Sequence, residues 1–358
     1  MTRIEGTGNA RAKRDYPLNC WWVAAAGQEV SRRPLGRWLL GSRIVLYRTE
    51  AGSVVALEDR CAHRWAPLSE GKLLGDEIVC PYHGFQYNAR GMCTHVPVQA
   101  HVPAALKVRS FPVREHGTFV WIWTGNPERA DTALLPELPW FADPEFFQTQ
   151  AYYGEIGCNY MLVQENVLDL THVPHLHDAS QHEWLAPPAD VKVTDRTVTF
   201  AFAHSGVSIG DVPSDSVKAM MDVECGRKVN RRGWGTFVSP GCHFSGMDVE
   251  DPAPAQGKRD RYSFRSMHCT TPISADRCHY WWSIAQDYGH HIPKDELISM
   301  IHGFVATVFK QDKDLLEAIQ VTVDQGAATS PEVLLASDRA AIEARRIVQR
   351  MLDAEAAT

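Results

Sequence analysis

The sequence predicts an α+β protein of two domains, a small all-β domain followed by a larger one in which helices flank an antiparallel sheet. Up to about residue 126, short β-rich runs alternate with Gly, Asn and Asp turns. The next stretch, NPERADTALLPELPWFADPEFF, is rich in proline and lacks periodicity, as connections do. Beyond it, strand and helix patterns are mixed. We therefore place the domains at residues 1–126 and 127–358, with the N-terminal residues free to pack on the second domain.

The predicted elements follow in order along the chain. In the first domain, β-rich runs begin near residue 36 and close with a hairpin pattern at residues 111–125. The second domain is predicted to contain a helix near 159–172, strands at 191–204, 233–247, 262–272 and 278–286, a long helix at 296–320 and a terminal helix within 330–357.

Composition argues against two classes of protein. The net charge of -7 is wrong for a nucleic-acid-binding protein, which needs a basic surface facing phosphate. No apolar run approaches the roughly 18 residues of a membrane span, and the opening MTRIEGTGNARAKRDYP lacks the apolar core of a signal peptide. The odd count of 9 cysteines favours reduced thiols over a disulfide framework. We expect a cytoplasmic protein with no membrane or nucleic-acid partner.

Two short arms of the first domain each carry one cysteine and one histidine, namely Cys61 with His63 and Cys80 with His83. Structural zinc accepts two cysteines and two histidines, but its usual arms pair like with like. In a Rieske centre, two cysteines hold one iron of a [2Fe-2S] cluster and two histidines hold the other, so each arm supplies one ligand to each iron. The mixed arms favour the two-iron cluster and leave zinc as the alternative.

A second polar group lies in QENVLDLTHVPHLHDAS. Glu165, Asp169 and His172 follow helical spacing within an otherwise apolar segment, and buried polar groups need partners. Pro174 cannot continue that helix, so the chain is expected to turn after His172 and to bring His177 beside it. Two histidines plus one carboxylate form the usual set for iron(II) that activates oxygen.

The carboxylate is expected from the late helix FVATVFKQDKDLLEAIQV. Asp312 falls inside a predicted apolar stripe, whereas Asp314 and Glu317 point elsewhere; the stripe consists of Phe304, Val308, Leu315 and Ile319. A carboxylate facing a core needs a cation. The alternatives are a buried arginine as its partner or a capping role.

These motifs resemble those of one known family. C-x-H followed by CPYHGF resembles the cluster motif of Rieske proteins, N-x-x-D-x-x-H-x4-H from Asn166 to His177 resembles the mononuclear iron motif of the Rieske non-haem iron oxygenases, and QDKD resembles the segment with their third ligand. The matches occur in the expected order and cover most of the chain. In length the chain is similar to single-subunit-type oxygenase components such as those of vanillate O-demethylase and dicamba monooxygenase.

The resemblance implies two cofactors. A Rieske [2Fe-2S] cluster would be held by Cys61, His63, Cys80 and His83, and a mononuclear Fe(II) by His172, His177 and Asp312, with Asn166 near the iron. It also implies a homotrimer, in which His83 donates a hydrogen bond across the interface to Asp169, and Asp169 holds His172 and bridges electron transfer between subunits. Asp169 as an ordinary polar helix residue is the alternative.

The implied reaction is oxidation of a small aromatic compound by O2, with electrons from NAD(P)H through a partner reductase or ferredoxin. The chain has no G-x-G-x-x-G dinucleotide loop of its own. The resemblance favours O-demethylation of a methoxylated aromatic acid as part of aromatic catabolism. Ring or methyl hydroxylation and N-demethylation would use the same iron site. A Rieske electron-transfer protein and a zinc-binding module are the non-enzyme alternatives.

Candidate substrate contacts lie in two segments of the second domain. Residues 205–234 lack periodicity and carry Met220 and Met221, so they form either a loop around an apolar ligand or a surface loop. A basic cluster in the same segment, which could instead dock an acidic ferredoxin, consists of Arg227, Lys228, Arg231 and Arg232. Strand alternation places His268 on one face with Ser266. It either binds a polar substituent of the substrate, such as a carboxylate, or is a satisfied core histidine.

Overall fold

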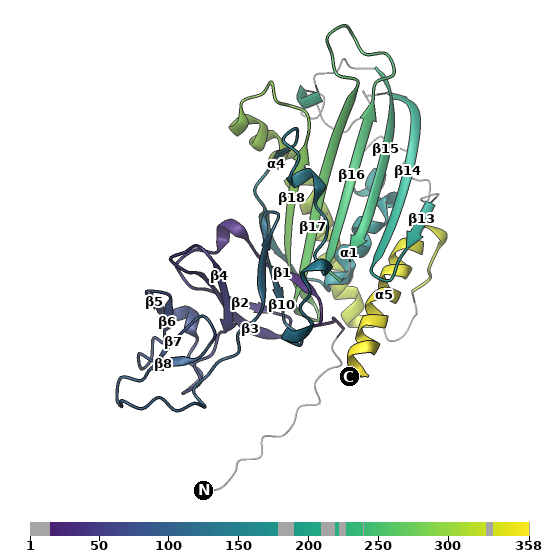
Figure 1. Cartoon of the computed structure of the whole chain (residues 1–358). Coiled ribbons are helices and arrows are strands. Elements are labelled where there is room, and N and C mark those ends of the chain that lie inside the picture. Colours follow the sequence, from purple (N-terminus) through teal and green to yellow (C-terminus); the bar gives the residue numbers. More distant parts are fainter. Residues whose placement is uncertain are drawn as a thin grey trace.

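The computed structural model describes residues 15–177, 190–208, 219–221, 227–238, 240–326 and 332–357. Its N-terminal part contains three small antiparallel sheets, which lie beside one end of a much larger sheet (Figure 1). Their strand orders are β1-β10-β9, β2-β3-β4 and β5-β6-β7-β8. The strands span Trp21–Ala26 (β1), Leu35–Leu39 (β2), Ser42–Arg48 (β3), Val54–Glu58 (β4), Lys72–Leu74 (β5), Glu77–Val79 (β6), Gln86–Tyr87 (β7), Cys93–His95 (β8), Val113–His116 (β9) and Phe119–Trp123 (β10).

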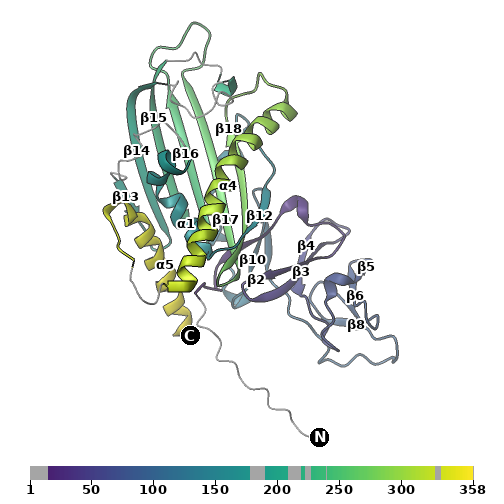
Figure 2. The ribbon, with the colours of Figure 1, turned by 180° about the vertical axis from the view of Figure 1, so that it is seen from behind.

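The C-terminal part is an 8-stranded antiparallel sheet of order β11-β18-β17-β16-β15-β14-β13, with β12 also pairing with β18. Helices α1, α4 and α5 cross one face of it (Figure 2). These elements span Phe147–Gln148 (β11), Tyr152–Ile156 (β12), Tyr160–Leu168 (α1), Val173–Leu176 (α2), Asp190–Val193 (β13), Thr197–Ser208 (β14), Lys228–Val238 (β15), Cys242–Glu250 (β16), Arg261–Ser274 (β17), Arg277–Gln286 (β18), Lys294–Gly326 (α4) and Arg339–Ala356 (α5). The predicted α+β class is confirmed.

Two cores pack on the two faces of the large sheet. On the helix face, Phe200 and Phe237 pack with Leu168 of α1 and Ile347 of α5. On the other face, Trp281 of β18 packs with aromatic side chains of β1 and β10, among them Trp21 and Trp123. Because successive strand residues point to opposite faces, the strands that carry the helix-face residues also anchor the N-terminal part.

The helix predicted at 159–172 is shorter than expected. Helix α1 ends at Leu168 because Asp169 is extended (φ -119, ψ 100) and its carboxylate accepts a hydrogen bond from the Thr171 backbone N–H. A local side-chain bond of this kind ends a helix and starts a new turn. A 3-10 turn at Leu170–His172 and the short α2 follow, with Pro174 in the first turn of α2, where proline is tolerated.

The predicted apolar stripe of α4 was wrong by one residue in phase. Leu315 and Ile319 are 42% and 37% exposed. The buried stripe instead consists of Leu297, Ile301, Val305, Leu316 and Gln320, with Phe309 partly buried. Asp312 lies four residues before Leu316, so it faces the sheet as predicted although the stripe used to place it was misread.

The segment predicted to be irregular at 205–234 is partly strand, and residues 209–218 and 222–226 of it lie outside the described residues. Strand β15 places members of the basic cluster on opposite faces of the sheet. Arg231 is buried on the helix face, and Arg232 points to the other face. Arg227 pairs with Asp251 through Nε and Oδ2, 2.5 Å apart. Met220 and Met221 are buried in the core.

The ends of the described chain meet near α1 and α5. Asp15 Oδ2 accepts a hydrogen bond from Asn159 Nδ2 at 2.6 Å, and Glu355 Oε1 accepts from the backbone N–H groups of Leu18 and Asn19 at 2.7 and 2.5 Å. N-terminal residues therefore pack on the C-terminal part. Among the residues described, none of the helices has both the length and the apolar character of a membrane span.

Candidate metal centres and active site

Three side chains from two separate segments meet on the helix face of the sheet. Asp312 Oδ1 lies 3.4 Å from His172 Nε2 and 3.3 Å from His177 Nε2, and one ligand atom from each of the three residues lies within 4.8 Å of the others. Spacings near 3 Å suit neighbouring ligands of one metal ion. Two histidines and one carboxylate on one side leave the opposite positions open, which is the ligand set of oxygen-activating iron(II). We call these three residues the triad.

The other ring nitrogen of each histidine is already engaged. His172 Nδ1 donates to the Asp169 carbonyl oxygen at 2.6 Å, and His177 Nδ1 donates to Gln311 Oε1 at 3.0 Å. Since a neutral imidazole has one N–H, both Nε2 atoms keep their lone pairs. The tautomers are therefore those that bind a metal through Nε2, and the residues fit the iron that the motif implies.

The electrostatics of the triad favour a cation between its members. Burial alone raises the pKa of Asp312, but the hydrogen bonds and positive charge that His172 and His177 offer in their protonated form outweigh that effect and hold the pKa of Asp312 well below its ordinary value. A metal ion bound by the neutral rings takes the place of those protons. Burial likewise lowers the pKa of His177, yet its bonds to Asp312 and Gln311 raise it overall. Positive charge is stabilised at this point, as a divalent ion requires.

Two amides border the triad. Asn166 Nδ2 lies 3.2 Å from Asp312 Oδ1 and 3.5 Å from His172 Nε2, so Asn166 lies at the site as expected. Gln311 was missed by the sequence reasoning. Its position beside Asp312 was the available signal, but only the fold shows that its side chain reaches His177.

Asp169 contacts His172 within this chain through its backbone. Its carbonyl oxygen accepts from His172 Nδ1, and its carboxylate accepts from the Thr171 backbone N–H. The extended backbone at Asp169, where α1 ends, turns that carbonyl toward the ring that follows it.

The two Cys/His arms form loops of the same construction. Cys61 N donates to Ala66 O and Trp65 N to Cys61 O, each at 2.9 Å. Cys80 N donates to Phe85 O at 2.8 Å and Gly84 N to Cys80 O at 3.1 Å. The matched fourth-following residues, Trp65 and Gly84, have positive φ angles of 62° and 71°. Two similar tight loops thus present their cysteines and histidines side by side.

The four arm residues fit a two-iron cluster better than a single zinc ion. The His63 and His83 rings lie 4.8 Å apart and are exposed, whereas Cys61 and Cys80 are buried beneath them. The two cysteines thus lie on the inner side and the two histidines on the outer side, as separate ligand pairs for two irons require. Tyr87 Oη, 3.2 Å from Cys61 Sγ, supplies a hydroxyl to one thiolate.

His268 lies on the helix face, two strand positions from Ser266 on that same face and cross-strand from Trp282. Its Nδ1 is 2.7 Å from Tyr280 Oη and its Nε2 is 3.0 Å from Ser266 Oγ, and its ring lies 5.2 Å from that of Phe309, one turn before Asp312. Burial lowers the pKa of His268 to about 4, so the ring is neutral. Both nitrogens have protein partners.

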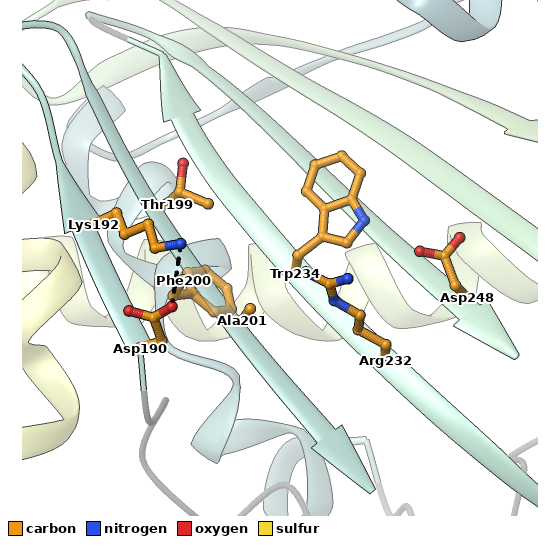
Figure 3. Close-up of a pocket in the computed structure, with 8 residues that line it drawn as sticks. All are labelled: Asp190, Lys192, Thr199, Phe200, Ala201, Arg232, Trp234 and Asp248. Carbon is orange, nitrogen blue, oxygen red and sulfur yellow. Dashed lines mark ion pairs between the residues drawn. The ribbon is translucent and has the colours of Figure 1, made fainter.

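A separate hollow of about 310 Å³ lies on the other face of the sheet (Figure 3). Arg232 and Trp234 line it, and they alternate along β15 with residues that pack toward the helices. Lys192 and Asp190, 3.5 Å apart, form its rim. The hollow is therefore remote from the triad.

Comparison with known proteins identifies both parts of the chain. Residues 20–112 match the Rieske [2Fe-2S] domain, and residues 156–354 match the vanillate O-demethylase oxygenase C-terminal domain. The chain is 32% identical to the dicamba O-demethylase oxygenase component of Stenotrophomonas maltophilia, with 96% of this chain and 99% of that protein covered. It is 29% identical to the chloroacetanilide N-alkylformylase oxygenase component of Rhizorhabdus wittichii, covering 94% and 96%.

Solved structures agree with the fold. Dicamba monooxygenase with non-haem iron and dicamba superposes with a TM-score of 0.78 at 28% identity, covering 97% of this chain and 99% of that one. The similarity extends over both parts of the chain, and the two cofactors inferred from the motifs are those of the matched domain and structure. The chain belongs to the Rieske non-haem iron oxygenases and is an oxygenase component of that family.

Proposed function

We propose that this oxygenase removes the methyl group of a methoxylated aromatic acid, and that the residues named above hold its metals. The observation that carries the proposal is the triad, whose two Nε2 atoms and one carboxylate oxygen face a common point. The dicamba relative is an O-demethylase by name. When bound, iron at the triad supplies reductive activation of O2, and the cluster supplies electrons singly.

The chain's own residues have simple tasks in this reaction. The Asp169 carbonyl and the Gln311 amide hold the two imidazoles in their metal-binding tautomers. Phe309, Trp282 and Tyr280 pack together, with Phe309 5.2 Å from the Trp282 ring and 5.9 Å from the Tyr280 ring, and form an apolar cluster against the turn of α4 that precedes Asp312. Hydroxylation of the methoxy carbon, with O2 as the oxidant and two electrons from the reductase, would give a hemiacetal that releases formaldehyde.

A single turnover tests the reaction without the unidentified reductase. The iron-loaded protein is reduced chemically, freed of excess reductant and mixed with O2 and a panel of methoxylated and methylated aromatic acids. We expect formaldehyde in proportion to active sites with a methoxylated acid. A hydroxylated product without formaldehyde would refute O-demethylation while leaving the family assignment intact.

N-demethylation or hydroxylation is the second candidate. The chain is similar over 94% of its length to an N-alkylformylase, and this relative favours an N-alkyl substrate. The same iron site would serve O-demethylation and N-dealkylation alike. An N-methylated or N-alkylated aromatic compound in the same panel distinguishes N-dealkylation from O-demethylation, because the compound that yields an aldehyde identifies the bond that is cleaved.

We also propose a homotrimer in which Asp169 carries electrons between subunits. Two exposed aromatic side chains beside the arm histidines support an interface there: Trp65 is 71% and Tyr82 63% exposed. Leu315 and Ile319 give α4 an exposed apolar strip on the other part of the chain. We expect Asp169→Asn to keep both metals but nearly to abolish turnover. Normal coupled turnover in that variant would disprove the bridge.

His268 is proposed to recognise a polar substituent of the substrate. Its location beside Phe309 and its neutral ring support hydrogen bonding rather than ion pairing. To bind a ligand, its Nε2 would have to exchange Ser266 for the substrate. Unchanged substrate affinity in His268→Ala would exclude this role.

Electrons come from a reductase or ferredoxin that uses NAD(P)H, and the reaction takes place in the cytoplasm. The boundary between the cluster domain and the catalytic domain is kept at residues 126 and 127. It falls between the end of β10 and the 3-10 turn at Pro127–Arg129, in a stretch without strands.

A further inference from the structure

The two histidines of the triad are anchored in different ways. His172 Nδ1 donates to a carbonyl only three residues earlier, so its ring is oriented by its own segment. His177 Nδ1 donates instead to Gln311, which is 134 residues away along the chain. The orientation of the second histidine therefore depends on α4.

Gln311 and Asp312 are neighbours on α4 and act on the same ring from two sides. Gln311 Oε1 accepts from Nδ1 at 3.0 Å, while Asp312 Oδ1 lies 3.3 Å from Nε2. The His177 side chain is only 7% exposed, so water has little access to take over the Nδ1 bond. In the orientation observed, the amide oxygen faces the ring and accepts, which places the proton on Nδ1 and leaves Nε2 free.

We propose that Gln311 is a positioning residue that holds His177 in its metal-binding orientation and tautomer. This inference rests on the proposed triad. One helix then sets two of the three ligands, Asp312 directly and His177 through Gln311. The neutral amide does this without adding a second negative charge beside Asp312, which a carboxylate at the same place would add.

Metal affinity tests the proposal directly. The mononuclear iron is removed with a chelator, the cluster is kept intact, and Fe(II) is titrated back anaerobically against a competing chelator. We expect Gln311→Leu to weaken Fe(II) binding by about 10–100-fold, the usual effect of losing a partner of a metal-bound histidine. Gln311→Glu, which keeps the acceptor, should bind within a few-fold of the wild type. The visible spectrum of Co(II) at the site should change in Gln311→Leu only.

The control is Gln325→Leu, the same substitution at an exposed position of the same helix, which should change nothing. Gln311→Met fills the amide's volume and replaces Gln311→Leu if the latter melts at a lower temperature. Wild-type affinity and Co(II) spectrum in Gln311→Leu would overturn the proposal, as would equal losses in Gln311→Leu and Gln311→Glu. A wild-type protein that takes up no Fe(II) would refute the triad itself.

Discussion

At the scale of single residues, the hydroxyl of Tyr87 shows how the chain adjusts its cluster. Tyr87 Oη lies 3.2 Å from Cys61 Sγ and also accepts from Ala62 N at 3.2 Å, so its own proton is directed to the sulfur. A hydrogen bond to a cluster sulfur stabilises the more negative, reduced state. We predict that Tyr87→Phe lowers the reduction potential of the cluster, as measured by a redox titration followed by EPR. An unchanged potential with an intact cluster would contradict this.

Trp65 is a second residue whose role is visible only in its backbone. It adopts a φ of 62°, which costs a bulky residue roughly 1–2 kcal/mol, while the matching loop places Gly84 there. Its indole is 71% exposed, so the fold does not need it. We predict that Trp65→Gly keeps cluster content and does not lower thermal stability, since glycine relieves the backbone strain, but weakens self-association in sedimentation velocity. Unchanged association would argue against an interface at the arms.

At the scale of elements, α5 fixes α1 through one arginine. Arg345 forms a bidentate ion pair with the Glu165 carboxylate, and its Nη1 donates to Glu332 Oε2 at 2.6 Å. The Glu165 carbonyl in turn accepts from Asp169 N at 3.1 Å, at the point where α1 ends beside the triad. The ion pair thus supports the helix end that orients His172.

We predict that Arg345→Met destabilises the protein by about 2 kcal/mol, because it leaves a largely buried carboxylate without its partner. The melting temperature should fall by about 3 °C. Arg346→Met is the matched control, since Arg346 is exposed and pairs with Glu343 of the same helix, and it should shift the melting temperature by less than about 1 °C. Equal shifts in the two variants would show that the Arg345–Glu165 pair stabilises the protein no more than the surface pair does.

Elements also show what could be read from the sequence and what could not. The strands and long helices could be predicted because their hydrophobic periodicity is a local property of the sequence. The two arms could be predicted because the spacing of cysteine and histidine residues is typical of a metal site. The phase of α4 was misread because its exposed apolar residues, Leu315 and Ile319, resemble core residues in sequence. The break at Asp169 and the reach of Gln311 depend on side-chain bonds that no periodicity reports.

At the scale of the whole molecule, His279 joins the two parts of the chain. On β18, its Nε2 donates to Trp38 O of β2 at 2.8 Å, and its Nδ1 lies 2.9 Å from Tyr153 Oη. Burial, aided by the charge of Arg37, lowers its pKa from 6.5 to about 4, although the hydrogen bond to Trp38 O and the carboxylates of Glu155 and Glu29 favour the protonated ring. The folded junction therefore excludes the protonated ring.

The sign of the pH effect follows from that shift. Between about pH 6.5 and 4 the unfolded chain binds a proton at His279 that the folded chain does not. The contribution of His279 to the free energy of unfolding is therefore fully present above this window and is lost as the pH falls through it. We predict that the melting temperature declines from pH 7 to 4.5 and that His279→Gln, which retains a donor for Trp38 O, declines less. An equal decline in both would assign the effect to other groups.

The most direct test of the two-centre assignment is a count of iron and acid-labile sulfide per chain in the wild type, in Asp312→Ala and in Asp314→Ala. Asp314 is on the same helix but exposed and paired with Lys310, so its variant is the matched control. We predict about three irons and two sulfides for the wild type and for Asp314→Ala, and about two of each for Asp312→Ala. Two irons in the wild type, or three in Asp312→Ala, would contradict the assignment of the triad as the second iron centre.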